Sequence, residues 1–212
     1  MKRIAIGPLV LRRKLVYIAL NASDSWVAGH TRIDTSRQTP DCSFATDCYL
    51  GFFGPVSGIA VDKSGTLLVG YNASETPGGP MQLYAKTSSD GIHFSARIAL
   101  GGGATVNHHS VQVAAGRSAD EFVVVWQDDR MGANRAYNAF MRRTIDRGAT
   151  WEAPVRLSDR ADGAPYKSAA GHKFPYGDYL AVACDPLGTF HFIWGEGDTF
   201  KGPGGVFYTK GR

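Results

Sequence analysis

The chain has 212 residues, of which 43% are hydrophobic and 20% charged, and its formal net charge is +4 at pH 7. This length leaves room for a sizeable core, and 26 glycines with 10 prolines favour a turn-rich, all-β protein. Scattered lysines and arginines exclude the broad basic face of a nucleic-acid-binding protein, and the lack of an apolar run of roughly 20 residues excludes a membrane-spanning helix.

The N-terminal 25 residues resemble a signal peptide in outline, but the basic run Arg12–Lys14 splits their apolar stretch in two. Farther along, Cys42 and Cys48 are close enough in sequence to close a small disulfide loop in an oxidising compartment, or to remain free thiols. Cys184 lies in an apolar run and has the character of a small buried side chain. We therefore expect a secreted or cell-envelope protein.

A repeated pattern dominates the rest of the chain. Four apolar runs, each followed by a polar loop, begin near Leu15, Leu67, Phe122 and Phe190. Each run is about six residues long and rich in β-branched and aromatic residues, which favours a strand over a helix. Recurrence at roughly 50 to 70 residues is typical of a repeat architecture.

Further strands are predicted around each run. An earlier strand joins it through a tight turn, as at Asp62–Gly65 and Asp185–Gly188, where glycine permits a positive φ. A third strand follows the polar loop, and residues 92–100 and 149–157 provide a fourth strand in the two middle units. Four-stranded antiparallel units of this size are the blades of a β-propeller.

The sequence thus predicts an all-β fold, one β-propeller domain over residues 1–212. Its units are expected at 1–50, 51–100, 101–158 and 168–212.

Two short segments after the third strands carry a family resemblance. The stretch TIDRGATW (144–151) matches the Asp-box pattern [ST]-x-D-x-G-x-T-W, and TSSDGIHF (87–94) is a degenerate copy with Phe94 in the tryptophan position. The chain therefore resembles the sialidase-type (BNR-repeat) propellers over most of residues 50–212. The resemblance implies a structural turn, on the face away from the active site, built by Asp90, Asp146, Gly148 and Trp151.

A second segment, FPYGDYLAVACDPLGTFHFIWGEG (174–197), resembles the late blades of sialidases. The resemblance places Tyr176 at the family's catalytic nucleophile and Glu196 as its partner, with Asp178 and His172 as further catalytic candidates. Two departures put intact sialidase chemistry in doubt: Gly177 stands where the family has serine, and the family's Arg-Ile-Pro motif is missing from this sequence.

Enzymes on this scaffold use the face where the loops into the inner strands meet the loops joining the second and third strands. Arg130 could grip a substrate carboxylate there, or form a salt bridge with Asp128 or Asp129. We expect the substrate-binding residues to be Arg130, Asp129, His108, His109, Asn107 and Lys173.

Other chemistries remain open on the same face. His108, His109 and His172 would suit a lyase that abstracts a proton next to a carboxylate, or they only form hydrogen bonds in the loops. No metal-ligand spacing supports zinc, so no metal or other cofactor is expected, although Ca²⁺ in an Asp-rich loop is left open. The partner we expect is a glycan or glycoconjugate, either hydrolysed or bound by a non-catalytic propeller.

The number of blades raises a further expectation. Sialidase propellers have six blades, whereas this sequence offers three clear units and a degraded first one, about four in all. We expect an incomplete propeller, an unusual four-bladed closure, or self-association that completes a ring.

Overall fold

The computed structural model describes residues 31–37, 55–131, 136–165, 167–168, 171–175, 180–199 and 203–212. The chain divides into two compact units, Met1–Arg32 and Ile33–Arg212, and every strand that the structure describes belongs to the second. The predicted unit 1–50 and the pair Cys42 and Cys48 lie outside the described residues, apart from residues 31–37. No helix occurs in the described ranges, and so none that could cross a membrane.

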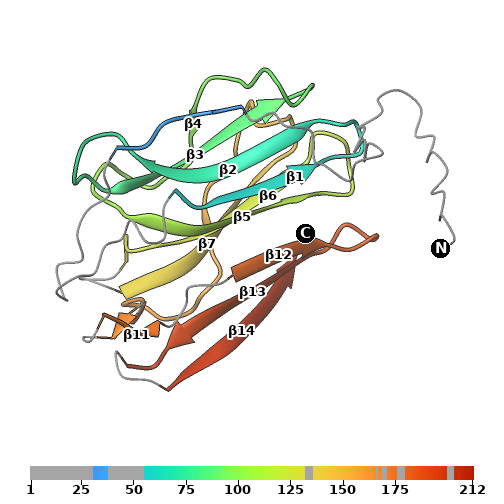
Figure 1. Ribbon diagram of the computed structural model, residues 1–212. Coiled ribbons are helices and arrows are strands. Elements are labelled where there is room, and N and C mark those ends of the chain that lie inside the picture. The colour runs from blue at the N-terminus through green and yellow to red at the C-terminus, as the bar shows by residue number, and fades with distance from the viewer. Residues whose placement is uncertain are drawn as a thin grey trace, which may run out of the picture. The chain divides into compact units, whose positions relative to one another are not determined.

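Three larger antiparallel sheets and one two-stranded sheet form the described part of the fold (Figure 1). The first sheet, blade A, runs in the order β1 (Ser57–Val61), β2 (Leu67–Ser74), β3 (Met81–Ser88) and β4 (Ile98–Ala99). Blade B follows with β5 (His108–Ala115), β6 (Phe122–Asp128), β7 (Ala136–Thr144) and β8 (Val155–Arg156), and β9 (Ala164–Pro165) also pairs with β7. Blade C contains β12 (Leu180–Cys184), β13 (Phe190–Gly197) and β14 (Gly204–Gly211), and a small separate sheet pairs β10 (Lys167–Ser168) with β11 (Gly171–Pro175).

This arrangement confirms the predicted all-β propeller fold. The strands of blade A span residues 57–99, those of blade B residues 108–165 and those of blade C residues 180–211. The fourth strands are shorter than expected, with two residues each in β4 and β8.

The hairpins form where the sequence predicts them because an aspartate organises each turn. The Asp62 carboxylate accepts hydrogen bonds from the backbone N–H groups of Ser64 and Thr66, both at 2.9 Å, and Gly65 has φ of 85°. Asp185 and Gly188 repeat this arrangement before β13. Each turn thus satisfies its own backbone donors and fixes the register of the strands that follow.

The core lies between the sheets. Because successive side chains of a strand point to opposite faces, β6 packs Phe122, Val124 and Trp126 against blade A and Val123 and Val125 against blade C. All seven residues of β6 are buried. Figure 1 shows this strand between the sheets of blades A and C, which explains why its first five residues are all apolar.

The turn at 144–151 satisfies its own polar groups. Asp146 Oδ1 accepts hydrogen bonds from the Thr144 hydroxyl and the Thr150 backbone N–H, both at 2.8 Å, and Gly148 has φ of 85°. Trp151 donates its indole N–H to the Gly148 carbonyl at 3.1 Å and packs on the core between blades A and B. The Asp90 turn is similar but one residue shorter.

Candidate functional site

The polar residues of interest lie at one end of the sheets, where each second strand runs into the third. We call this end the upper face. Hydrogen bonds across blades show that the ends coincide: Asn72 Nδ2 donates to the His108 carbonyl at 2.7 Å, and Gln127 Nε2 donates to the Gly195 carbonyl at 3.4 Å. The turns at 88–94 and 144–151 lie at the opposite end, between third and fourth strands.

The same aromatic–carboxylate pair occurs in each blade of the described chain. The fifth residue of the second strand is Tyr71, Trp126 or Trp194, and its polar hydrogen meets a carboxylate in every case. Tyr71 donates to Asp34, whereas each tryptophan donates at 2.6 Å to the seventh residue of its own strand, Asp128 or Glu196. What differs among the blades is how the carboxylate is neutralised.

Between blades A and B, Asp128 is neutralised by an arginine. Arg130 Nη2 lies 2.5 Å and Nε 2.9 Å from Asp128 Oδ2, and the guanidinium sits over the Phe140 ring at 4.3 Å. Asp128 is fully buried, while the Arg130 side chain is 16% exposed. A Cβ at Gly102 would lie 2.6 Å from Arg130 Cζ, so the 101–103 loop closes tightly over this pair. Arg130 is therefore engaged by the salt bridge named among the sequence alternatives.

His108 lies at the same boundary between blades A and B and is fully buried. We call the boundary between two neighbouring blades a seam. Its Nδ1 donates to the Met81 carbonyl at 2.9 Å and its Nε2 accepts from the Gly102 backbone N–H at 3.2 Å, an arrangement that fixes the neutral tautomer. Burial lowers the pKa of His108, partly opposed by the Asp128 charge nearby. Both ring nitrogens thus serve the packing of the loop.

The other predicted binding residues near β5 bond to one another. The Asn107 backbone N–H and side-chain amide donate to Asp129 at 2.9 and 3.3 Å. Burial raises the pKa of Asp129. The His109 ring is 4% exposed and lies 4.3 Å from the Tyr137 ring, centroid to centroid.

Between blades B and C, Glu196 stands in a different environment. It is 3% exposed, Trp194 holds its Oε1, and its Oε2 has no hydrogen-bond partner among the described residues. Burial raises the pKa of Glu196, and the charges of Asp159 and Asp198 act in the same direction while Arg160 opposes them. A buried carboxyl with one unused oxygen and a raised pKa can exchange a proton.

Arg160 is a functional candidate that the sequence reasoning missed. Its Nη1 donates to the Gly197 carbonyl at 2.7 Å and its Nη2 to the Asp198 carbonyl at 3.4 Å. The guanidinium is thus held against the two residues that follow Glu196 in the chain. The side chain is 37% exposed. The stretch around it matches no motif, and only its contact across 37 residues gives it a place in the site.

The remaining predicted residues fall where less can be said. Tyr176 and Asp178 lie outside the described residues, between β11 and β12. For His172 and Lys173 the structure describes only the backbone, which belongs to β11. Over the described ranges no group of three His, Cys, Asp or Glu side chains is placed to hold a metal ion.

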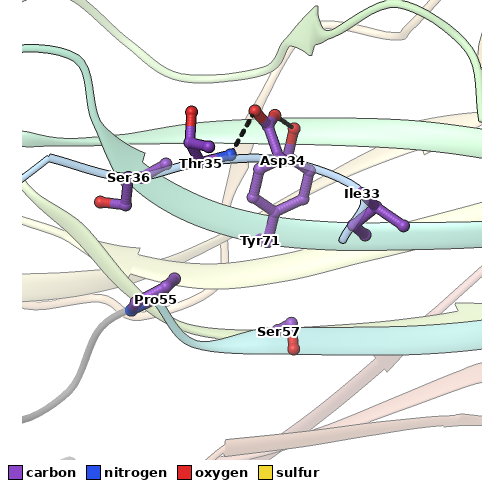
Figure 2. A pocket seen from close by; sticks show the side chains of 8 residues that line it. Ile33, Asp34, Thr35, Ser36, Pro55, Ser57 and Tyr71 are labelled. Atoms are coloured by element: carbon purple, nitrogen blue, oxygen red, sulfur yellow. Dashed lines mark hydrogen bonds between the residues drawn. The ribbon is translucent and has the colours of Figure 1, made fainter. Parts of the chain in front are cut away.

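A cavity of about 190 Å³ lies at the edge of blade A (Figure 2). Figure 2 shows the Tyr71 ring pointing toward Asp34, whose carboxylate also accepts from the Thr35 backbone N–H at 2.7 Å. Arg97 binds Asp34 through Nε and Nη2, both at 2.7 Å, so the pKa of Asp34 is held well below its usual range. The cavity is lined by Ile33, Asp34, Thr35, Ser36, Pro55, Ser57, Tyr71 and Ala73.

This cavity occupies the seam position that carries the acid in the other blades. Ala73 is the seventh residue of β2, equivalent to Asp128 and Glu196, and its small side chain leaves space there. Asp34 supplies the carboxylate instead, and its charge is already matched by Arg97. The structure describes three seam carboxylates, those of Asp34, Asp128 and Glu196. Of these three, only Glu196 has no arginine bonded to it.

No family model and no curated protein matches this chain. Solved structures similar to it include the Hadza microbial sialidase Hz136, at 13% identity and a TM-score of 0.49 over 73% of this chain and 34% of that one. The GH93 α-L-arabinofuranosidase of Fusarium graminearum has 18% identity and a TM-score of 0.47, and the α-L-arabinanase of Penicillium chrysogenum has 17% identity and the same TM-score. Each of these two matches covers 69% of this chain and 41% of the other.

This chain therefore spans less than half the length of the proteins it resembles in structure. Identities of 13% to 18% bear on the fold alone. The activity has to be argued from the residues of this chain.

Proposed function

We propose that this chain is part of a sialidase-type (BNR-repeat) propeller that hydrolyses glycans, with Glu196 as the carboxyl that exchanges a proton. The observation that carries the proposal is the state of Glu196: buried, held at one oxygen by Trp194, and free at the other oxygen of any partner among the described residues. Leaving a buried carboxyl unmatched costs stability, and carboxyls with a perturbed pKa gather at functional sites.

The proposed chemistry is a retaining hydrolysis with a tyrosine nucleophile. Glu196 accepts the phenol proton of Tyr176 while the tyrosine oxygen bonds to the anomeric carbon and the glycosidic oxygen departs with a proton from Asp178. Water then attacks the anomeric carbon, gives its proton to Asp178, and the tyrosine oxygen recovers its proton from Glu196. A raised pKa makes the Glu196 carboxylate a stronger base for the first transfer.

The two turns of the opposite face support the family assignment. Asp146 and Asp90 each bind backbone N–H groups of their own turn and lie between third and fourth strands. That is the structural role the resemblance implies, and it leaves the upper face for the glycan.

A non-catalytic glycan-binding propeller is the second candidate. The observation that favours it is the salt bridge of Arg130, because a sialidase needs arginines free to grip a carboxylate.

Turnover separates the two candidates. We would assay the full chain against aryl glycosides of neutral sugars, a fluorogenic sialoside and acidic polysaccharides, with Glu196→Gln and Tyr176→Phe as test variants. Glu152→Gln is the matched control, since Glu152 is exposed and lies away from the upper face, paired with Arg143. We expect hydrolysis of at least one glycoside, lost in both test variants and kept in the control.

Glycan binding without turnover would reject the hydrolase and support the binding propeller. If the chain forms unsaturated products from an acidic polysaccharide and His172→Ala abolishes them, the hydrolase would be rejected in favour of a lyase.

A further inference from the structure

We infer that the sugar unit bound beside Glu196 is uncharged, a neutral glycoside rather than a sialoside or uronide. The inference rests on the proposed function, because it concerns the glycan taken by the same site. It follows from how charge is distributed in the two seams of the upper face.

The equivalent positions of blades B and C carry opposite charges. Arg130 stands two residues after Asp128 and folds back to bind it at 2.5 Å. Two residues after Glu196 the chain has Asp198, whose side chain is 58% exposed. The residue that neutralises the first seam is thus replaced by a second acid in the next one.

The B–C seam is consequently acidic among the residues that the structure describes. Asp159 is exposed and, together with Asp198, acts electrostatically on Glu196, while Arg160 is the cation that opposes them. A ligand carboxylate that approached Arg160 would meet Asp198, whose Oδ1 is 3.8 Å from Arg160 Nη1. Like charges at such distances repel, so the seam disfavours an anionic sugar.

The other arginine that the structure describes on the upper face, Arg130, cannot compensate without cost. Arg130 would have to leave the fully buried Asp128 carboxylate to bind a ligand carboxylate. Breaking a buried pair leaves an unmatched charge, which is strongly unfavourable.

The same groups suit the hydroxyls of a neutral sugar. Glu196 Oε2 can accept a hydroxyl hydrogen, or donate to a hydroxyl oxygen when protonated. Arg160 is fixed by two carbonyls, and its Nε has no partner among the described residues, so it can donate to a hydroxyl oxygen.

Binding measurements that need no turnover test the inference. The full chain would be titrated by saturation-transfer NMR and calorimetry with methyl glycosides of neutral sugars, and with methyl glucuronide, methyl galacturonide and a methyl sialoside. We expect at least one neutral glycoside to bind about tenfold more tightly than every anionic one. An anionic glycoside that binds as tightly as the best neutral one would overturn the inference.

A charge variant gives an independent check. Asp198→Asn should tighten binding of the anionic glycosides about threefold or more and leave the neutral ones within about twofold, because it removes repulsion felt only by a charged ligand. Glu152→Gln removes the same charge away from the upper face and should change neither class. Equal effects of the two variants on the anionic glycosides would contradict the inference.

Failure of the proposed function would look different. Neutral glycosides that bind but are never hydrolysed would reject the hydrolase and leave the charge preference standing. Hydrolysis of a sialoside that depends on Glu196 would support the hydrolase and reject the charge preference.

Discussion

Trp194 donates its indole N–H to Glu196 Oε1 at 2.6 Å, two residues along the same strand. The preceding blade repeats this bond at the same length between Trp126 and Asp128. In blade B the acid is also bound by Arg130, whereas in blade C no arginine bonds to Glu196 among the described residues. The same aromatic–carboxylate hydrogen bond is therefore combined with an ion pair between blades A and B, and with a buried carboxyl that no described arginine binds between blades B and C.

Replacing Trp194 or Trp126 by phenylalanine should show that the Glu196 carboxyl has less support than the Asp128 carboxylate. Trp194→Phe removes the one hydrogen bond that the Glu196 carboxyl has among the described residues, so we expect the free energy of unfolding at pH 8 to fall by about 1–3 kcal/mol beyond the packing loss. Trp126→Phe should lose less, because Asp128 keeps its bonds to Arg130. Urea denaturation measures both, and equal losses would contradict the assignment of Glu196 as the less supported acid.

The ion pair between Arg130 and Asp128 should be a stability determinant. Arg130→Ala leaves a buried carboxylate unmatched, and we expect a loss of about 3–5 kcal/mol in the free energy of unfolding. Arg147→Ala breaks the exposed pair with Asp120 and should cost about 0–1 kcal/mol. Similar midpoints for the two variants in urea would mean that Arg130 is not needed by the fold and is free for a ligand.

Acid unfolding should report on the turn at 144–151. Hydrogen bonds from Thr150 and Thr144 lower the pKa of Asp146 to about 2. Since the unfolded chain has the ordinary aspartate pKa of about 3.9, the carboxylate stabilises the fold above that pH, and this contribution is lost as the pH falls through about 2.

Asp146→Asn should therefore flatten the dependence of melting temperature on pH between about 4 and 2, while the wild-type chain loses stability over that interval. The measurement is a series of thermal melts followed by circular dichroism. Parallel curves for the two proteins would show that Asp146 does not support the turn through its charge.

Close contact between blades A and B depends on a glycine in β1. A Cβ at Gly58 would lie 2.8 Å from the Gln112 Cα and 2.9 Å from the Val113 backbone nitrogen, both in β5. Gly58→Ala should push the sheets apart and lower the free energy of unfolding by about 1–3 kcal/mol. Gly211→Ala meets nothing within 4 Å and is the control. An unchanged Gly58→Ala protein would contradict the packing of β1 on β5.

The blades could be predicted because their signals are local. The first five residues of β6 are all apolar because the strand is buried on both faces, and the Asp62 and Asp185 turns carry their own hydrogen-bond acceptors and glycines. The site was less predictable. Glu196 came from a family resemblance, and Arg130 was named with its salt bridge as an alternative.

Arg160 and Asp34 were not predicted as site residues because their partners are distant in sequence. Arg160 meets Gly197 across 37 residues, and Asp34 meets Arg97 across 63. No local spacing encodes such contacts, which arise only when the sheets pack. The proton-exchange role that we propose for Glu196 likewise depends on its burial and on the lack of a hydrogen-bond partner at its Oε2 within the described chain.

The most direct test of the account is an NMR titration of Glu196 itself. The side-chain carboxyl carbon of Glu196, assigned with Glu196→Gln, would be followed from pH 3 to pH 9 together with the Trp194 indole resonance. We expect a midpoint above the ordinary glutamate pKa of about 4.3, because burial disfavours the charged form, and a matching shift of the indole that donates to it. A midpoint at or below that value would show that Glu196 is a solvated or neutralised carboxylate and would contradict its role as the proton-exchanging group.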